Sequence, residues 1–349
     1  MIPPGSTIGI LGGGQLGRMT ALAAASMGYD THIYCPAPDS PAFHVSRYHT
    51  QAAYDDEKAL AEFAKEVAVV TFEFENVPAT VPKLLSQYVP VRPKGEILHI
   101  SQNRLREKAF AQKCGVPTAP FVAVKDLKSA IDIVGTPCIL KTTELGYDGK
   151  GQLFIEKDFE GIDITSPSIL EAYVPFQTEV SSLVARSPDG AMAAFPTVEN
   201  VHENGILRTT YAPARVDDSI ASEAEKLTKH LAEQLELVGL LAVEYFVTQE
   251  GTLLFNEMAP RPHNSGHWTL DGCVTSQFEQ LIRAICGLPL GSTHVHTPIV
   301  MENLLGDECL QWESSLQDPH QKLHLYGKEK MLPGRKMGHV NRMNKILCT

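Results

Sequence analysis

The apolar residues of the first third of the chain occur in short runs that alternate with helical patterns. Residues 7–11 read as a buried strand, 15–27 as a helix, 32–35 as a second strand and 67–74 as a later one. Strands that alternate with helices in this way are typical of a doubly wound α/β unit with a parallel sheet. We therefore expect a domain of this kind in residues 1–100.

Glycine and proline then interrupt the chain at 115–117 and 135–137. Such pairs mark turns. Short apolar runs lie between and after them, at 121–124, 138–141 and 153–155. This spacing predicts a small α+β unit at about 112–172, within a central domain of residues 101–172.

The apolar segments lengthen in the remainder of the chain, which we expect to form a third domain of residues 173–349. Leu227, Leu231, Leu235 and Val238 recur at helical spacing and predict a helix over 221–238. Residues 241–247 and 252–257 read as two strands joined by a four-residue hairpin connection. The last residues, 344–349, carry no obvious capping element.

Composition describes a folded globular protein. Of its residues, 43% are hydrophobic and 20% are charged. A chain of 349 residues is too long for one ordinary core, so two or three domains are expected. The formal net charge of −11 argues against a nucleic-acid surface. Small anionic ligands can still bind, because a local cluster of donors outweighs a distant acidic surface that salt screens.

Cysteine usage and hydropathy indicate a reducing compartment. The seven cysteines are scattered and form no Cys-x-x-Cys, so neither a disulfide framework nor a zinc site is indicated. The N-terminus lacks a basic region followed by an apolar run, and no stretch is long enough to span a bilayer. We expect a cytoplasmic protein.

The first candidate site is the glycine-rich segment 12–17, Gly-Gly-Gly-Gln-Leu-Gly, between a predicted strand and a predicted helix. Glycines at such a turn let backbone N–H groups approach a phosphate at the helix N-terminus. A dinucleotide site also needs an acidic residue at the end of the second strand, yet the nearest, Asp39, lies beyond two prolines. A nicotinamide cofactor is therefore disfavoured, and a phosphate site or a tight structural turn both remain open.

The second candidate is the loop at 146–151, which has three glycines in six residues between two predicted strands. Glycine would be a poor choice for a plain hairpin, whereas a loop that closes over phosphates needs this mobility and its bare N–H donors. Lys141, at the end of the preceding strand, could reach the same phosphates. A flexible surface hairpin is the alternative.

The third candidate is a pair of glutamates on the predicted hairpin. Counting back from the connection pairs Val247 with Thr252 and Glu244 with Phe255, which puts Glu257 on the same face as Glu244. Asn256 adds an amide oxygen. Carboxylates in apolar strands are expensive to bury without a cation, and hard oxygen ligands suit Mg²⁺ that bridges ATP phosphates. A solvated edge is the alternative.

Two further segments offer anion-binding groups. Residues 259–268 contain an arginine, two imidazoles, an amide and a hydroxyl on a path stiffened by two prolines, which suits recognition of a phosphate and a sugar. A zinc site at His263 and His267 is disfavoured, because no H-E-x-x-H helix is present. Residues 333–339 place Arg335 and Lys336 beside a turn, either as an anion site or as an exposed turn.

Taken together, these segments resemble the N5-carboxyaminoimidazole ribonucleotide synthetase family of ATP-grasp enzymes, which acts in purine biosynthesis. The resemblance covers nearly the whole chain. Its motifs are GGGQLGRM at 12–19, TFEFENV at 71–77, QNRLREK at 102–108, GVPTAPF at 115–121, ILKTTELGYDGKGQ at 139–152, HENGILRTT at 202–210, FNEMAPRPHNSGHWT at 255–269 and PGRKMGH at 333–339. A generic ATP-grasp enzyme would share only the loop and the metal-binding acids.

The resemblance implies an ATP-grasp fold and a two-step reaction. ATP phosphorylates bicarbonate to carboxyphosphate, and the exocyclic amine of 5-aminoimidazole ribonucleotide then takes the carboxyl group, releasing ADP and phosphate. It also implies a homodimer. The implied ATP-binding residues are Arg104, Lys141, Gly146, Tyr147, Asp148, Gly149, Lys150, Gly151, Gln152, Glu171, Ala172, Tyr173, Val174, Glu179, His202, Asn256 and Glu257, with Glu244 and Glu257 as the Mg²⁺ ligands.

The second substrate has its own implied residues. Arg261, Lys336, Tyr147 and Asp148 are the implied catalytic residues, and Asp148 is the candidate for accepting or steering the amine's proton. The implied contacts for the ribonucleotide and bicarbonate are Gln15, Leu16, Glu73, His263, Asn264, Arg335 and Lys336. Since water destroys carboxyphosphate, we expect the glycine loop to close as a lid.

Three alternatives remain to be separated by experiment. A nicotinamide dehydrogenase would leave the glycine loop and the glutamate pair unexplained, and a non-catalytic nucleotide-binding regulator would leave the second-substrate cluster unexplained. A formate-using transformylase or a biotin carboxylase is the nearest competitor among ATP-grasp enzymes.

Overall fold

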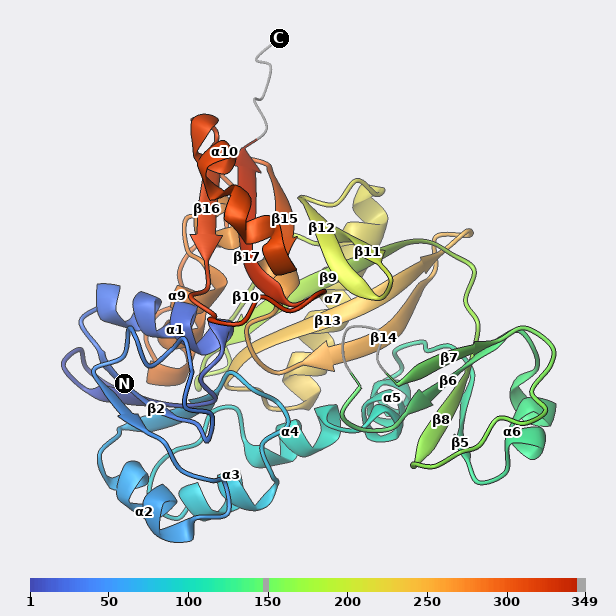
Figure 1. Ribbon diagram of the computed structural model, residues 1–349, viewed down its shortest axis with the longest axis horizontal. Coiled ribbons are helices and arrows are strands. Elements are labelled where there is room, and N and C mark those ends of the chain that lie inside the picture. Colours follow the sequence, from blue (N-terminus) through green and yellow to red (C-terminus); the bar gives the residue numbers. More distant parts are fainter. Residues whose placement is uncertain (147–150, 344–349) are drawn as a thin grey trace.

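The N-terminal part of the molecule is a parallel sheet covered by helices. A computed structural model describes residues 1–146 and 151–343 (Figure 1). Strands β1 (Thr7–Leu11), β2 (Asp30–Tyr34), β3 (Tyr48–Thr50) and β4 (Val69–Phe72) pair in parallel, in the order β3-β2-β1-β4. The helices are α1 (Gln15–Ser26), α2 (Glu57–Lys65), α3 (Thr80–Leu85) and α4 (Gly95–Ser101). The predicted parallel α/β unit is thereby confirmed.

A small antiparallel sheet follows, and in Figure 1 it stands apart from the rest of the molecule. Helix α5 (Arg104–Lys113) leads into β5 (Phe121–Val124), α6 (Leu127–Val134), β6 (Cys138–Thr142), β7 (Gln152–Ile155) and β8 (Ser168–Ala172). The strand order is β5-β8-β6-β7. Side chains from α6 and the strands, such as Ile131, Cys138 and Leu170, form a separate small core.

The third sheet is the largest and is antiparallel. Its path is β14-β13-β9-β11-β12-β15-β17-β16, with β10 paired to β9. The bounds are β9 (Phe176–Arg186), β10 (Met192–Ala194), β11 (Val198–Glu203), β12 (Ile206–Ala212), β13 (Gly239–Thr248), β14 (Leu253–Ala259), β15 (Ile299–Leu305), β16 (Gln321–Leu325) and β17 (Lys336–Met343). The helices of this part are α7 (Asp218–Gln234), η1 (Asn264–Gly266), α8 (Thr269–Gly272), α9 (Gln277–Cys286), η2 (Gly306–Gln311) and α10 (Trp312–Gln317).

Strand β13 is buried on both faces, which explains its continuous apolar sequence. Leu240 and Ala242 belong to the core that includes α9, whereas Leu241 and Val243 belong to the core that includes α7. Successive side chains of a strand point to opposite faces, so a strand covered on both sides needs apolar residues at nearly every position. Glu244 interrupts this run.

The helix predicted over 221–238 is displaced. Helix α7 spans Asp218–Gln234, and Glu236 adopts a positive φ of 47°. Leu235 and Leu237 are buried in the same core as the helix. The apolar spacing therefore continues through a turn that is not helical, which is why the pattern overran the helix end.

No helix within residues 1–146 and 151–343 combines the length and hydropathy needed to cross a membrane.

Candidate active site

A cavity of about 990 Å³ is lined by residues of the large sheet and by segments that follow strands of the two smaller sheets. Its lining includes the glycine turn after β1, the segment after β6, the middle of β13 and the end of β14. Twelve of the predicted site residues line it: Gln15, Leu16, Glu73, Arg104, Gly146, Glu244, Glu257, Arg261, His263, Asn264, Arg335 and Lys336. Ligand sites commonly lie in such a cavity between structural units.

The remaining predicted residues do not line this cavity or cannot be placed. Those outside its lining are Lys141, Gly151, Gln152, Glu171, Ala172, Tyr173, Val174, Glu179, His202 and Asn256. Tyr147, Asp148, Gly149 and Lys150 lie outside the described residues.

The glutamate pair is formed by a register that differs from the predicted one. Glu244 lies directly opposite Glu257, and Tyr245 lies opposite Phe255, so that Asn256 is the extra residue of a β-bulge. The predicted pairing of Glu244 with Phe255 is wrong, because counting from the hairpin cannot reveal a bulge. Both carboxylates nevertheless meet on one side of the hairpin.

The two carboxyl groups have opposite pKa shifts. Burial and the nearby negative charge of Glu257 raise the pKa of Glu244 to about 7. Burial alone would also raise the pKa of Glu257, but the Arg104 guanidinium, 2.9 Å away, lowers it to about 2. The pair therefore carries one fixed charge and one charge that depends on whether a cation is present.

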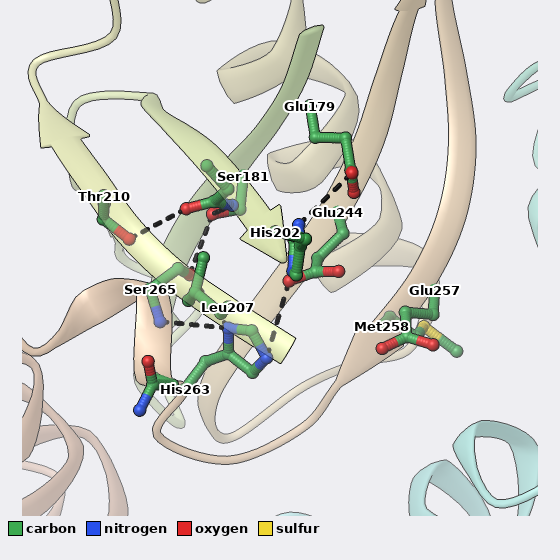
Figure 2. A network of polar contacts seen from close by, with 12 residues as sticks. Glu179, Ser181, His202, Leu207, Thr210, Glu244, Glu257, Met258, His263 and Ser265 are labelled. Atoms are coloured by element: carbon green, nitrogen blue, oxygen red, sulfur yellow. Dashed lines mark hydrogen bonds and ion pairs between the residues drawn. The ribbon is translucent and has the colours of Figure 1, made fainter. Parts of the chain in front are cut away.

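The oxygens around this pair fit a magnesium ion. Asn256 Oδ1 is buried and has no hydrogen-bond partner among the described residues, so it too is an oxygen that a ligand could satisfy. Carboxylate and amide oxygens are the ligands that Mg²⁺ prefers. The side chains of Glu179, His202 and Glu244 also lie near one another (Figure 2). One ligand atom from each lies within 4.8 Å of those of the other two.

His202 is oriented by Glu179. The His202 Nδ1 to Glu179 Oε1 distance is 3.2 Å. Burial lowers the pKa of His202, but the contact with Glu179 and the charge of Glu244 outweigh it, and the pKa is raised overall. This region therefore combines an imidazole with two carboxyl groups, an arrangement that suits hydroxyl groups and phosphates together.

The lysine predicted to reach phosphates is held in a buried ion cluster. Lys141 Nζ lies 2.9 Å and Lys108 Nζ lies 3.4 Å from Glu171 Oε2. Burial raises the pKa of Glu171, but the two lysines outweigh this effect, so its pKa falls below the ordinary value. Lys108 also donates to the carbonyl of Asn256 at 2.9 Å, which connects the small sheet to β14.

Helix α5 contributes three charged residues that sequence reasoning used only in part. Arg104 was predicted, but Glu107 and Lys108 were not. Glu107 Oε2 accepts the Met258 N–H at 3.0 Å, and burial keeps the pKa of Glu107 well above its ordinary value. The signal that was overlooked is the charged run at 102–108, which lies on a helix whose buried side is polar.

The glycine turn holds a carboxylate. Glu73 Oε1 accepts the Gly14 N–H at 2.8 Å, and Glu73 Oε2 accepts the Gly17 N–H at 3.3 Å. A Cβ on Gly12 would lie 2.6 Å from Glu73 Cγ, and one on Gly14 would lie 2.9 Å from Glu73 Oε2. The close approach of Glu73 therefore requires these glycines, and the turn is structural in this state.

Arg261 and His263 follow the end of β14, and each is held by its own partners. Arg261 Nη2 lies 2.9 Å from Glu75 Oε2, a partner that sequence reasoning missed. His263 Nδ1 lies 2.8 Å from Ser265 Oγ, and His263 Nε2 lies 3.7 Å from Glu244 Oε1. Burial and the positive charge of Arg261 lower the pKa of His263 to about 3, so the ring is neutral at physiological pH.

The side-chain amide of Asn264 is hydrogen-bonded to that of Asn303. Asn264 Nδ2 donates to Asn303 Oδ1 at 3.0 Å, and Asn303 Nδ2 donates back to Asn264 Oδ1 at 2.6 Å. This reciprocal pair ties η1 to β15. On this geometry Asn264 shapes the cavity wall more than it offers polar atoms to a ligand.

Arg335 and Lys336 lie where the C-terminal strands meet the cavity. Arg335 Nη1 donates to the carbonyl of Lys330 at 2.8 Å, and Lys336 begins β17 opposite Leu305. Lys328 Nζ donates to the Lys336 carbonyl at 2.7 Å. The segment thus brings three cations to one side of the cavity.

Three family models match consecutive parts of the chain. Residues 5–102 match the ribonucleotide synthetase preATP-grasp domain, and residues 109–278 match the ATP-grasp domain. Residues 299–346 match the phosphoribosylaminoimidazole carboxylase C-terminal domain. The combination assigns the chain to the ATP-grasp enzymes.

Whole-length relatives decide which ATP-grasp family it is. The N5-carboxyaminoimidazole ribonucleotide synthase of Brucella melitensis is 47% identical, and the match covers 98% of this chain and 97% of that protein. The chain belongs to the N5-carboxyaminoimidazole ribonucleotide synthase family. It is therefore an ATP-dependent ligase.

One further relative and one solved structure are also similar to this chain. The bifunctional purine synthesis protein purC/E of Dictyostelium discoideum is 48% identical over 98% of this chain, which spans 37% of that protein's length. The structure of the synthase from Aspergillus clavatus, in complex with ADP and 5-aminoimidazole ribonucleotide, has a TM-score of 0.91 and 30% identity. It covers 97% of this chain and 94% of that one.

Proposed function

We propose that this synthase uses ATP and bicarbonate to form carboxyphosphate, and transfers its carboxyl group to the exocyclic amine of 5-aminoimidazole ribonucleotide. The products are N5-carboxyaminoimidazole ribonucleotide, ADP and phosphate. The observation that carries this proposal is the single cavity that joins the Glu244–Glu257 pair to Arg261, His263 and Lys336. Carboxylation of 5-aminoimidazole ribonucleotide at the expense of ATP is the reaction for which the family is named.

Magnesium is the proposed cofactor, held by Glu244 and Glu257 with Asn256 beside them. When bound, Mg²⁺ neutralises the charge of the ATP phosphates. Arg104 lies 2.9 Å from Glu257 and would add a fixed positive charge beside the phosphates. Phosphoryl transfer depends chiefly on positioning and charge neutralisation, so this arrangement supports it.

The proposed ATP site extends from this pair toward the small sheet. Lys141 and residues 146–152 would meet the phosphates, and the backbone of residues 171–174 would meet the adenine. Glu179 would accept the ribose hydroxyls beside His202. Support comes from Tyr173, an exposed residue that directly follows β8. Its ring packs against that of Phe154, with the ring centroids 5.3 Å apart.

The proposed second-substrate site lies on the opposite side of the cavity. Arg261, Arg335 and Lys336 would bind anionic groups of the ribonucleotide and bicarbonate, and His263 and Glu73 would contact them from the cavity wall. The proposal that Tyr147 and Asp148 close over the site, with Asp148 receiving the amine's proton, concerns residues outside the described ranges. Asp148→Asn tests it, since full carboxylation with an unchanged pH profile would exclude that role.

The decisive experiment is a test of what ADP release requires. We expect ADP release by the Mg²⁺-loaded protein only when bicarbonate and 5-aminoimidazole ribonucleotide are both present, with isotope from labelled bicarbonate entering the product. Formate or biotin in place of these substrates should give no ADP. ADP release that formate or biotin supports would assign the chain to another ATP-grasp reaction.

Three further properties are proposed on family resemblance. The chain is divided into domains of residues 1–100, 101–172 and 173–349, it forms a homodimer, and it works in the cytoplasm. Its described cysteines are all free, which supports a reducing compartment. Sedimentation of the purified protein tests the dimer.

A further inference from the structure

A row of buried polar side chains crosses one face of the large sheet and ends at the cavity. Ser181 lies directly opposite Glu244 on β9 and β13, and Asn200 lies directly opposite Thr210 on β11 and β12. Ser181, Thr210 and Ser265 are fully buried, and Asn200 nearly so. Burying hydroxyl and amide groups costs free energy unless they are hydrogen-bonded, so the row must satisfy itself internally.

The members of the row are joined by hydrogen bonds, drawn as dashed lines in Figure 2. Thr210 Oγ1 donates to Asn200 Oδ1 at 3.0 Å, and Asn200 Nδ2 donates to Ser181 Oγ at 2.9 Å. Ser181 Oγ donates to Ser265 Oγ at 2.8 Å, and Ser265 Oγ lies 2.8 Å from His263 Nδ1. A hydroxyl has only one proton, so a Ser265 that accepts from Ser181 has its own proton to give to the imidazole.

An independent donor fixes the role of the ring nitrogen. The backbone N–H of Ser265 also donates to His263 Nδ1, at 3.4 Å, and a backbone N–H can only donate. A neutral imidazole whose Nδ1 accepts carries its proton on Nε2. His263 Nε2 is 3.7 Å from Glu244 Oε1, which is beyond hydrogen-bond distance, and His263 lines the cavity.

We infer that Thr210, Asn200, Ser181 and Ser265 are positioning residues that hold His263 as the Nε2–H tautomer. The ring then presents a hydrogen-bond donor to an anionic carboxyl oxygen bound in the cavity, that of bicarbonate or of the carboxyl group in transfer. The opposite tautomer would present a lone pair to the same oxygen and repel it. This inference rests on the proposed carboxylation, because it assigns the anion that the donor meets.

The inference depends on the direction of the hydrogen bonds along the row, so a substitution that reverses this direction without changing the side-chain shape tests it. Asn200→Asp replaces the Nδ2 donor by an acceptor of nearly the same shape. At a pH where this carboxyl is ionised, Ser181 must donate to it, Ser265 then donates to Ser181, and His263 is driven to place its proton on Nδ1. Ser181→Ala is the milder variant, since it interrupts the row without reversing it.

The tautomer is read directly by the ¹⁵N chemical shifts of labelled histidine, which distinguish a protonated ring nitrogen from a bare one. His263→Gln identifies the His263 signals. We expect Nε2–H in the wild type, a mixture of tautomers in Ser181→Ala, and Nδ1–H in Asn200→Asp. We also expect kcat to fall by roughly 3–10-fold in Ser181→Ala and 10–100-fold in Asn200→Asp, with KM for ATP little changed.

A matched control removes a buried hydroxyl elsewhere. Thr228 Oγ1 lies 2.9 Å from Tyr245 Oη in the core on the other side of the sheet. Thr228→Val should leave both the His263 tautomer and kcat as in the wild type.

Two outcomes would overturn the inference. One is a wild-type His263 with its proton on Nδ1. The other is a fall in kcat in both variants while the Nε2–H tautomer persists, which would make the row merely structural. The tautomer is measured without substrates, so it stays informative even if the wild type fails to carboxylate 5-aminoimidazole ribonucleotide, a result that would reject the proposed function alone.

Discussion

Among single residues, Glu257 has the most demanding position, because it pairs with Arg104 and faces Glu244 across the hairpin. Replacing it by glutamine removes a proposed metal ligand and leaves a largely buried guanidinium without its carboxylate. We expect Glu257→Gln to lower the rate of ADP release by roughly 10²–10³-fold and to raise the Mg²⁺ concentration for half-maximal rate. Steady-state assays over a Mg²⁺ series measure both.

Glu302→Gln is the control for this variant. Glu302 forms a partly exposed ion pair with Arg342 on β15 and β17, at 2.8 Å. Exposed pairs contribute little, so its rate and Mg²⁺ dependence should match the wild type. A Glu257→Gln enzyme with wild-type Mg²⁺ dependence would remove Glu257 from the metal site.

Glu73 separates two roles for the glycine turn. In Glu73→Gln, the amide NH₂ would face one of the two N–H donors of Gly14 and Gly17. We expect the free energy of unfolding to fall by about 1–3 kcal/mol, the cost of a buried donor without an acceptor. Urea denaturation measures it, with Glu62→Gln, an exposed carboxylate on α2, as the control. A stable Glu73→Gln protein with a raised KM for the ribonucleotide would instead support a direct substrate role.

Among the secondary-structure elements, α5 connects two of the three sheets through its charged side. Lys108 donates to Asn256 on β14 and contacts Glu171 on β8. In Lys108→Met we expect a loss of about 1.5–3 kcal/mol in unfolding free energy, because a charged hydrogen bond is lost. KM for ATP should rise, since the small sheet is then less firmly placed over the proposed nucleotide site.

Lys113→Met is the matched control, because Lys113 ends the same helix and is exposed. Its unfolding free energy and KM for ATP should stay at wild-type values. If Lys108→Met binds ATP as tightly as the wild type, α5 does not set the position of the small sheet.

Elements with apolar periodicity could be predicted from the sequence, and elements with a polar buried side could not. Strand β1 was predicted at its observed bounds, since all but its first residue are buried. Helix α5 buries Arg104, Glu107 and Lys108, so its inward face carries no apolar spacing to recognise. The bulge at Asn256 was equally hidden, because a single extra residue shifts the register without changing the composition of the strand.

The same distinction applies to the site. Glu244, Glu257 and Arg261 could be predicted because charged side chains stand out in their segments of the sequence. Twelve of the predicted residues line one cavity. Glu75, Ser181 and Asn303 were not predicted, because they are recognised by their contacts with Arg261, Ser265 and Asn264. Their roles depend on contacts between distant strands.

For the whole molecule, stability should depend on a buried imidazole far from solvent. Burial lowers the pKa of His339 well below 6.5, and its Nδ1 contacts Tyr326 Oη at 2.9 Å. Below pH 6.5 the unfolded chain takes up a proton that the folded chain does not. The stability that neutral His339 contributes is therefore present above pH 6.5 and is lost as the pH falls.

His339→Gln tests this linkage. The difference in unfolding free energy between wild type and variant should shrink by up to about 1.4 kcal/mol per pH unit below pH 6.5. Urea titrations followed by the fluorescence of the buried Trp268 measure it. Tyr326→Phe keeps the imidazole, so its offset from the wild type should not depend on pH. A pH-independent offset for His339→Gln would contradict the linkage.

The cavity is lined by the large sheet and by segments that adjoin the other two sheets, which also bears on how the protein unfolds. A ligand that contacts all of these segments would act as a non-covalent cross-link between the three sheets. At a ligand concentration of 100 times Kd, binding raises the free energy of unfolding of the protein by about 2.7 kcal/mol. The small sheet, which has its own small core, gains most from this coupling. With substrates present, we expect the three sheets to unfold in one cooperative transition.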